Sequence, residues 1–71
     1  MVNVNKFKAK MVECGLNVDK LSEATGISRA TIYRRLNHPE EITIEEADGF
    51  AVALEMTGAE AAAIFFNQFV A

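Results

Sequence analysis

Three arginines and no acid lie within residues 28–39, in the run SRATIYRRLNHP. Arginine presents a planar fork of donors that matches the O6 and N7 atoms of guanine, and an alanine methyl packs against a thymine methyl. If residues 28–37 form a helix, Ile32 and Leu36 face inward together with Ile27. The opposite, open face then presents Arg29, Ala30, Tyr33, Arg34 and Asn37. Such a face is suited to contacts with the bases and phosphates of a nucleic acid.

Two short helices are predicted to position this face. Asn17 is a favourable N-cap, and Asp19 follows in the first turn, where the helix dipole favours an acid. Gly26 has the backbone freedom that ends the first helix, and Ser28 is the N-cap of the second. Two helices joined by a glycine-containing turn form the helix-turn-helix unit, whose second helix enters the major groove of DNA.

The segment resembles the helix-turn-helix of the Cro and phage-repressor (Xre-like) family. The matching residues are Leu21, Ser22, Gly26, Ile27, Ser28, Thr31 and Ile32. The resemblance implies an all-α, five-helix domain like that of Cro and lambda repressor. It also implies a sequence-specific transcriptional regulator of phage or prophage type that binds double-stranded DNA. The chain departs from the family pattern at Val18, where the family often has Gln, and at Arg35, where it often has an aliphatic residue.

The DNA-binding residues expected on this basis are Ser28, Arg29, Ala30, Tyr33, Arg34, Arg35, Asn37 and Lys20. Of these, Arg29, Ala30 and Arg34 are expected to contact bases. The side chains expected to contact the DNA backbone are Tyr33, Lys20, Arg35 and Asn37.

Charge is divided sharply along the chain. Residues 1–38 hold all seven bases and three of the ten acids, a net charge of +4, whereas residues 39–71 hold seven acids and no base, a net charge of −7. The whole chain is acidic, but a phosphate backbone meets the local basic patch. Attraction between the two halves within the fold is expected to account for one or two ion pairs, and it does not explain why bases cluster on the motif helix.

Three further helices are predicted around the motif, over residues 3–14, 44–55 and 58–69. The inward stripe of the first consists of Phe7, Met11 and Cys14. Capping boxes of the form Thr-x-x-Glu announce the other two. The core face expected for helix 44–55 consists of Ile44, Ala47, Phe50, Ala51 and Leu54. Gly49 inside this helix suggests close packing against a neighbour, because glycine there costs about 1 kcal/mol relative to alanine.

The last predicted helix is unusually apolar, with the run AEAAAIFFNQFVA. Phe65 is expected to join the core, whereas Phe66 lies about 100° away around the helix. Phe66, Phe69 and Val70 are therefore predicted to form an exposed patch, and such patches usually mark interfaces. A homodimer is expected, since this motif class usually reads two half-sites. The alternative is that most of this helix packs inward.

The remaining features exclude several classes of protein. A chain of 71 residues is expected to form a single domain, residues 1–71. Its single cysteine suits a cytoplasmic location, and no apolar run is long enough to span a membrane. No nucleophile, glycine-rich phosphate loop or metal-ligand spacing is found, so neither an enzyme nor a cofactor is expected. His38 is interpreted as a solvated residue at a helix end without partner ligands for a metal.

Two alternative functions remain open from the sequence. In the first, the fold is a protein-interaction module, like an anti-repressor, whose acidic half and apolar last helix bind another regulator. In the second, suggested by a similarity of the run TIYRRL to serine recombinases, the chain is a detached recombinase-like DNA-binding domain. Retention on random-sequence DNA at low salt distinguishes the first alternative from a DNA-binding regulator.

Overall fold

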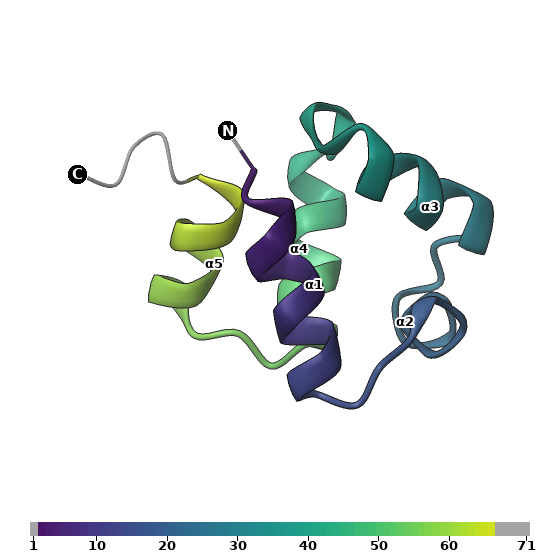
Figure 1. Ribbon diagram of the computed structural model, residues 1–71, viewed down its shortest axis with the longest axis horizontal. Coiled ribbons are helices and arrows are strands. Elements are labelled where there is room, and N and C mark those ends of the chain that lie inside the picture. Colours follow the sequence, from purple (N-terminus) through teal and green to yellow (C-terminus); the bar gives the residue numbers. More distant parts are fainter. Residues whose placement is uncertain (1, 67–71) are drawn as a thin grey trace.

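The computed structural model describes residues 2–66, and these residues are all helix, turn or loop without a strand. The helices are α1 (Val4–Glu13), α2 (Val18–Thr25), α3 (Arg29–Asn37), α4 (Ile44–Ala53) and α5 (Gly58–Phe65), with a 3-10 turn η1 (Pro39–Glu41) after α3. The predicted all-α, five-helix architecture is therefore confirmed. Figure 1 shows α1 and α4 in the middle of the molecule, α5 on one side and the α2–α3 pair on the other.

Polar N-caps start the helices at the residues that the sequence predicted. Asn17 and Ser28 accept hydrogen bonds from the backbone N–H groups of Lys20 and Thr31. Both predicted capping boxes are formed, at the starts of α4 and α5. These caps satisfy N–H groups that have no partner within their own helix. The starts of the motif helices are thus fixed by residues close to them in sequence.

The helix ends agree less well with prediction. Helix α4 ends at Ala53 and not at residue 55, because Glu55 takes a left-handed conformation (φ 51°) that does not continue a right-handed helix. Helix α5 was predicted to continue to residue 69, but it ends at Phe65, and Phe66 is its C-cap. Phe69 and Val70 lie outside the described residues.

The core is built around three phenylalanines. The ring centroids of Phe7 and Phe50 are 5.0 Å apart, and those of Phe7 and Phe65 are 5.5 Å apart. The other fully or nearly fully buried side chains are Met11, Leu21, Ile32, Ala47, Leu54 and Ile64. Leu21 and Ile32 come from the two motif helices, so the motif is anchored directly in the core.

Two expectations about α4 are wrong. Ile44 was placed in the core, but its side chain is 73% exposed. It begins the helix and lies roughly 90° from the centre of the buried face around Ala47, Phe50 and Leu54. Gly49 was expected to allow close packing, but a β-carbon built there would have no neighbouring atom within 4 Å.

Candidate nucleic-acid interface

The turn between α2 and α3 is held by hydroxyl groups. Gly26 has a left-handed conformation (φ 74°). The Ser22 hydroxyl donates to the carbonyl of Ile27 at 2.6 Å, and the N–H of Ile27 donates to the Thr25 hydroxyl at 3.2 Å. In the sequence, only the helical spacing of Ser22 and Thr25 points to this role. These bonds fix the angle at which α3 leaves the turn.

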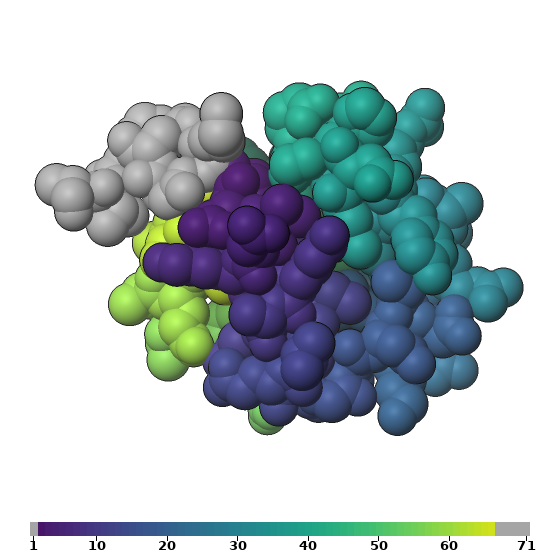
Figure 2. Space-filling view, in the orientation of Figure 1, coloured from purple at the N-terminus to yellow at the C-terminus, as the bar shows by residue number. Residues whose placement is uncertain are grey.

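The exposed face of α3 has the composition that the sequence predicted. Ile32 is fully buried, and Ile27 and Leu36 pack against the core. The exposed residues of the helix are Arg29, Ala30, Tyr33, Arg34 and Asn37. In Figure 2, α2 (blue) and α3 (teal) form one continuous surface, separated from α5 by α1. The polar and basic side chains of this exposed face are therefore accessible to a large ligand.

Two of the exposed arginines face acids nearby. Arg29 Nη1 lies 3.1 Å from Asp19 Oδ1 on α2. Arg34 Nε lies 3.7 Å from Glu41 Oε1 in η1. The side chains of Arg29 and Arg34 are 66% and 71% exposed, so these ion pairs are open to water. Exposed pairs of this kind contribute little stability.

Arg35 has a different environment from the other arginines. Its side chain is only 17% exposed, and it donates to both carboxylate oxygens of Glu46, at 2.8 and 3.1 Å, and to Glu41 at 3.2 Å. The guanidinium of Arg35 lowers the pKa of the Glu46 carboxyl, which also accepts from the backbone N–H of Thr43. Arg35 thus ties α3 to the start of α4, and this geometry does not favour the predicted contact with the DNA backbone.

Lys10 forms a further ion pair between the basic and acidic parts of the chain. Its ammonium lies 2.8 Å from Glu60 on α5, and this hydrogen bond raises the pKa of Lys10 and lowers the pKa of Glu60. Together with the contacts of Arg34 and Arg35, attraction between the two halves goes beyond the one or two pairs expected from the sequence. Among the described residues, the bases without an ion pair are Lys6, Lys8 and Lys20.

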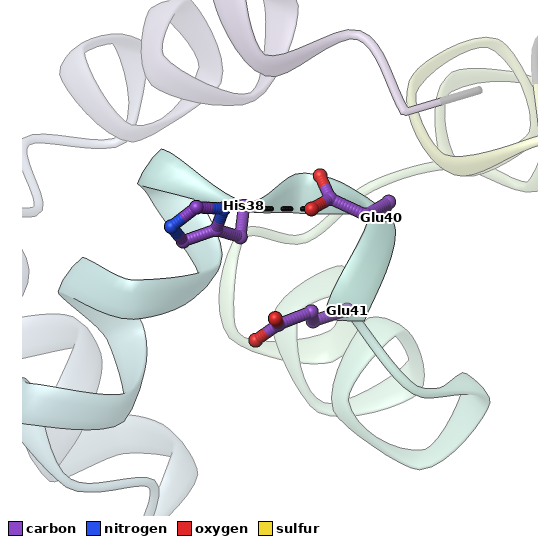
Figure 3. Close-up of side chains that lie close together, drawn as sticks. All are labelled: His38, Glu40 and Glu41. Atoms are coloured by element: carbon purple, nitrogen blue, oxygen red, sulfur yellow. Dashed lines mark ion pairs between the residues drawn. The ribbon is translucent and has the colours of Figure 1, made fainter.

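His38 has more neighbours than the sequence suggested. Its Nδ1 atom lies 3.4 Å from Glu40, and His38, Glu40 and Glu41 offer ligand atoms within 4.8 Å of one another (Figure 3). The expectation that His38 lacks partner ligands is therefore wrong. However, all three residues are exposed, and Arg34 and Arg35 already pair with Glu41. Two guanidinium groups beside the cluster oppose the binding of a cation.

Cys14 is a packing residue, as expected. It is partly buried against the core, and its thiol donates to the carbonyl of Leu54 at 3.2 Å. No helix in the described part of the chain is long and apolar enough to cross a membrane.

Residues 6–64 match the Cro/C1-type HTH DNA-binding domain. The chain belongs to this family. Membership identifies a DNA-binding regulator and confirms the resemblance seen in residues 21–32. It also favours a Cro/C1-type domain over a detached recombinase-like one. Comparison with curated proteins and with solved structures gives no match.

Proposed function

We propose that this Cro/C1-type protein is a sequence-specific transcriptional regulator of phage or prophage, of the Cro or repressor type. In this proposal residues 1–71 act as a single domain in the cytoplasm, without enzymatic activity, and α3 enters the major groove of double-stranded DNA. The observation that carries the proposal is the exposed face of α3. That face presents Arg29 and Arg34 and no acid, and the angle at which α3 leaves the turn is fixed by the hydrogen bonds of residues 22–28.

Individual roles follow from position on α3. Arg29, Ala30 and Arg34 are proposed to contact base edges, because they are exposed on the face opposite the buried Ile32. The side chains proposed to contact the phosphate backbone are Ser28, Tyr33, Asn37 and Lys20. Arg35 would contact the phosphate backbone only if it released Glu46 and Glu41, which already accept hydrogen bonds from its guanidinium.

The proposal is tested by selecting a binding site from random duplex DNA and comparing Arg34→Ala with wild type. Loss of a bidentate arginine–guanine contact is expected to cost roughly 1–3 kcal/mol and to relax preference at one base position. Lys8→Ala is the matched control, because it removes an exposed base of α1 that has no ion pair among the described residues. If Arg34→Ala keeps wild-type affinity and base preference, Arg34 does not read a base.

The proposed active form is a homodimer, in which a second copy of the chain packs against an apolar surface. Phe66 is 40% exposed and Ile44 is 73% exposed, and both line a small hollow at the end of α5 and the start of α4. Val2 and Ile42 complete this apolar surface. The predicted partners Phe69 and Val70 follow Phe66 in the chain. A second half-site would give the affinity that a single short recognition helix lacks.

The alternative of a protein-interaction module has its own support. Glu45 and Asp48 of α4, and Glu55 in the turn that follows it, are exposed and form no ion pair in the described part of the chain. An anti-repressor would use these acids and the apolar end of α5 to bind another regulator. Retention of the protein on random-sequence duplex at low salt, with elution by modest salt, supports the DNA-binding proposal, and absence of retention supports the alternative.

A further inference from the structure

An acid stands on the surface where DNA is proposed to bind. Asp19 and Arg29 are joined at 3.1 Å, and their side chains are 65% and 66% exposed. An exposed pair contributes only about 0–1 kcal/mol to stability, and an acid at this place repels phosphates. The ion pair itself therefore gives little stability, and the favourable place of Asp19 in the first turn of α2 does not depend on Arg29.

We propose that Asp19 is a positioning residue that orients the guanidinium of Arg29 for base recognition. This inference rests on the proposed function of α3 and adds a residue of α2 to the determinants of its specificity. The role is distinct from that of Lys20, which is expected to attract any phosphate.

The backbone at both residues of the ion pair, Asp19 and Arg29, is held in place by helix caps. Asp19 lies in the first turn of α2, where the Asn17 side chain accepts from the N–H of Lys20 at 2.9 Å. Arg29 is the first residue of α3, directly after the N-cap Ser28. The hydroxyl bonds of the turn between the two helices fix their relative orientation.

The hydrogen bond to Asp19 leaves Arg29 able to donate to a base. Only Nη1 of Arg29 donates to Asp19, so the other donors of the planar fork are not used in this pair. Arginine has a flexible side chain, and holding one end of the fork reduces the rotamer freedom that a base contact would otherwise have to remove. Asp19 thereby prepares Arg29 for a bidentate contact with guanine.

The ion pair is also expected to affect the difference in affinity between the specific site and random DNA. Asp19 and Arg29 together are neutral, so they add little to the electrostatic attraction that dominates non-specific binding. The hydrogen bonds of Arg29 to a base edge are available only on the correct sequence. Removal of the Asp19 charge is therefore expected to strengthen binding to random DNA and to weaken discrimination.

The experiment compares Asp19→Asn, Arg29→Ala and the double variant on a selected site and on a random duplex of equal length. The measured quantity is the discrimination ratio at one salt concentration, which is the dissociation constant for the random duplex divided by that for the selected site. Arg29→Ala is expected to lower this ratio about tenfold, which corresponds to loss of one base contact. Asp19→Asn is expected to lower the ratio about threefold or more while tightening binding to the random duplex. In the Arg29→Ala background, Asp19→Asn is expected to change the ratio no further, because the residue acts through Arg29.

Glu23→Gln provides the matched control. Glu23 is another exposed acid of α2, and it has no ion pair among residues 2–66. Its substitution is expected to tighten binding to both duplexes equally. Asp19→Ser serves as a second variant without the carboxylate, should Asp19→Asn fail to show the helical circular dichroism of wild type.

Two results overturn the inference while leaving the proposed function intact. The first is a ratio for Asp19→Asn equal to that of Glu23→Gln, which would mean that Asp19 only repels phosphates and has no part in discrimination. The second is an equal fall of the ratio in the presence and absence of Arg29, which would separate Asp19 from that arginine. A wild-type protein that binds neither duplex at low salt overturns the proposed function itself, and the inference with it.

Discussion

Lys20 is one of the bases left without an ion pair in the described part of the chain, and it lies in the first turn of α2. Its own N–H donates to Asn17, so its backbone is fixed although its side chain is exposed. We expect Lys20→Ala to weaken binding to all sequences alike and to reduce the slope of log affinity against log salt by about one phosphate contact. Titrations at several salt concentrations measure this slope, and an unchanged slope would exclude a phosphate contact by Lys20.

The exposed side chains of the candidate site were predictable, whereas their ion-pair partners were not. Helical spacing alone places Arg34 opposite Ile32, because the period of 3.6 residues is a local property. The partner of Arg35 is 11 residues away along the chain, and that of Lys10 is 50 residues away. Such contacts depend on how separate helices pack, and the sequence pattern of one helix contains no information about them.

Helices α1 and α4 end in the same kind of turn, with a different residue at its left-handed position. After α1 the left-handed position is Gly15, and Leu16 N–H donates to Met11. After α4 the corresponding position is Glu55, and Met56 N–H donates to the carbonyl of Ala51. A left-handed conformation is costly for a residue with a β-carbon but not for glycine.

We therefore expect Glu55→Gly to stabilise the protein by about 1 kcal/mol and Gly15→Ala to destabilise it by a similar amount. Urea denaturation followed by circular dichroism measures both changes. Equal and small effects of the two substitutions would show that the turn after α4 is not strained.

The junction between α3 and α4 is expected to make stability depend on pH. The Arg35 guanidinium lowers the pKa of Glu46, so the folded state holds the proton of this carboxyl less tightly than the unfolded state. The resulting stability is complete above the ordinary pKa of glutamate and is lost as pH falls through the lowered pKa of the folded state. Lys10 lowers the pKa of Glu60 in the same sense, so both contributions disappear on acidification.

Glu46→Gln separates this ion pair from the capping box, because glutamine also serves at the third position of such a box. We expect the variant to be less stable than wild type at pH 7, by about 1 kcal/mol, and to approach wild type near pH 3. Glu45→Gln is the control, since Glu45 is exposed and has no ion pair in the described residues. Denaturant midpoints at the two pH values test the prediction, and a constant difference between wild type and Glu46→Gln would refute it.

The helices themselves were predictable mainly from their first turns. Caps at Asn17, Ser28, Thr43 and Thr57 act on N–H groups three residues away, so short sequence patterns suffice to place the starts. The inward direction assigned to Ile44 failed, because Ile44 lies about 90° around the helix from the centre of the buried face and is left 73% exposed. How wide a face of a helix becomes buried depends on the helices that pack against it, and the pattern of one helix does not contain that information.

On the scale of the whole molecule, opposite parts of the chain carry different chemistry. The α2–α3 surface lies at one side of Figure 1 and α5 at the other, with α1 and α4 between them. Lys10 and Arg35 form ion pairs with acids of α5 and α4, so their charges are compensated where the basic and acidic parts of the chain meet. The two arginines that remain exposed, Arg29 and Arg34, both lie on α3, although the chain as a whole has a net charge of −3. Local charge, and not net charge, decides which surface a phosphate backbone approaches.

Assembly is expected to depend on the apolar surface at the end of α5. Phe66→Asp would place a charge in a dry contact between two copies, whereas the fold should survive because the core side chains Phe7, Phe50 and Phe65 are unchanged. Sedimentation should then show a monomer with helical circular dichroism, and affinity for a two-half-site DNA should fall. Val12→Asp is the control, since Val12 is 79% exposed on α1 and should leave the dimer intact. If Phe66→Asp unfolds the protein, Ile44→Asp provides the same test at a residue that is 73% exposed. A folded dimer in either variant would place the interface elsewhere on the molecule.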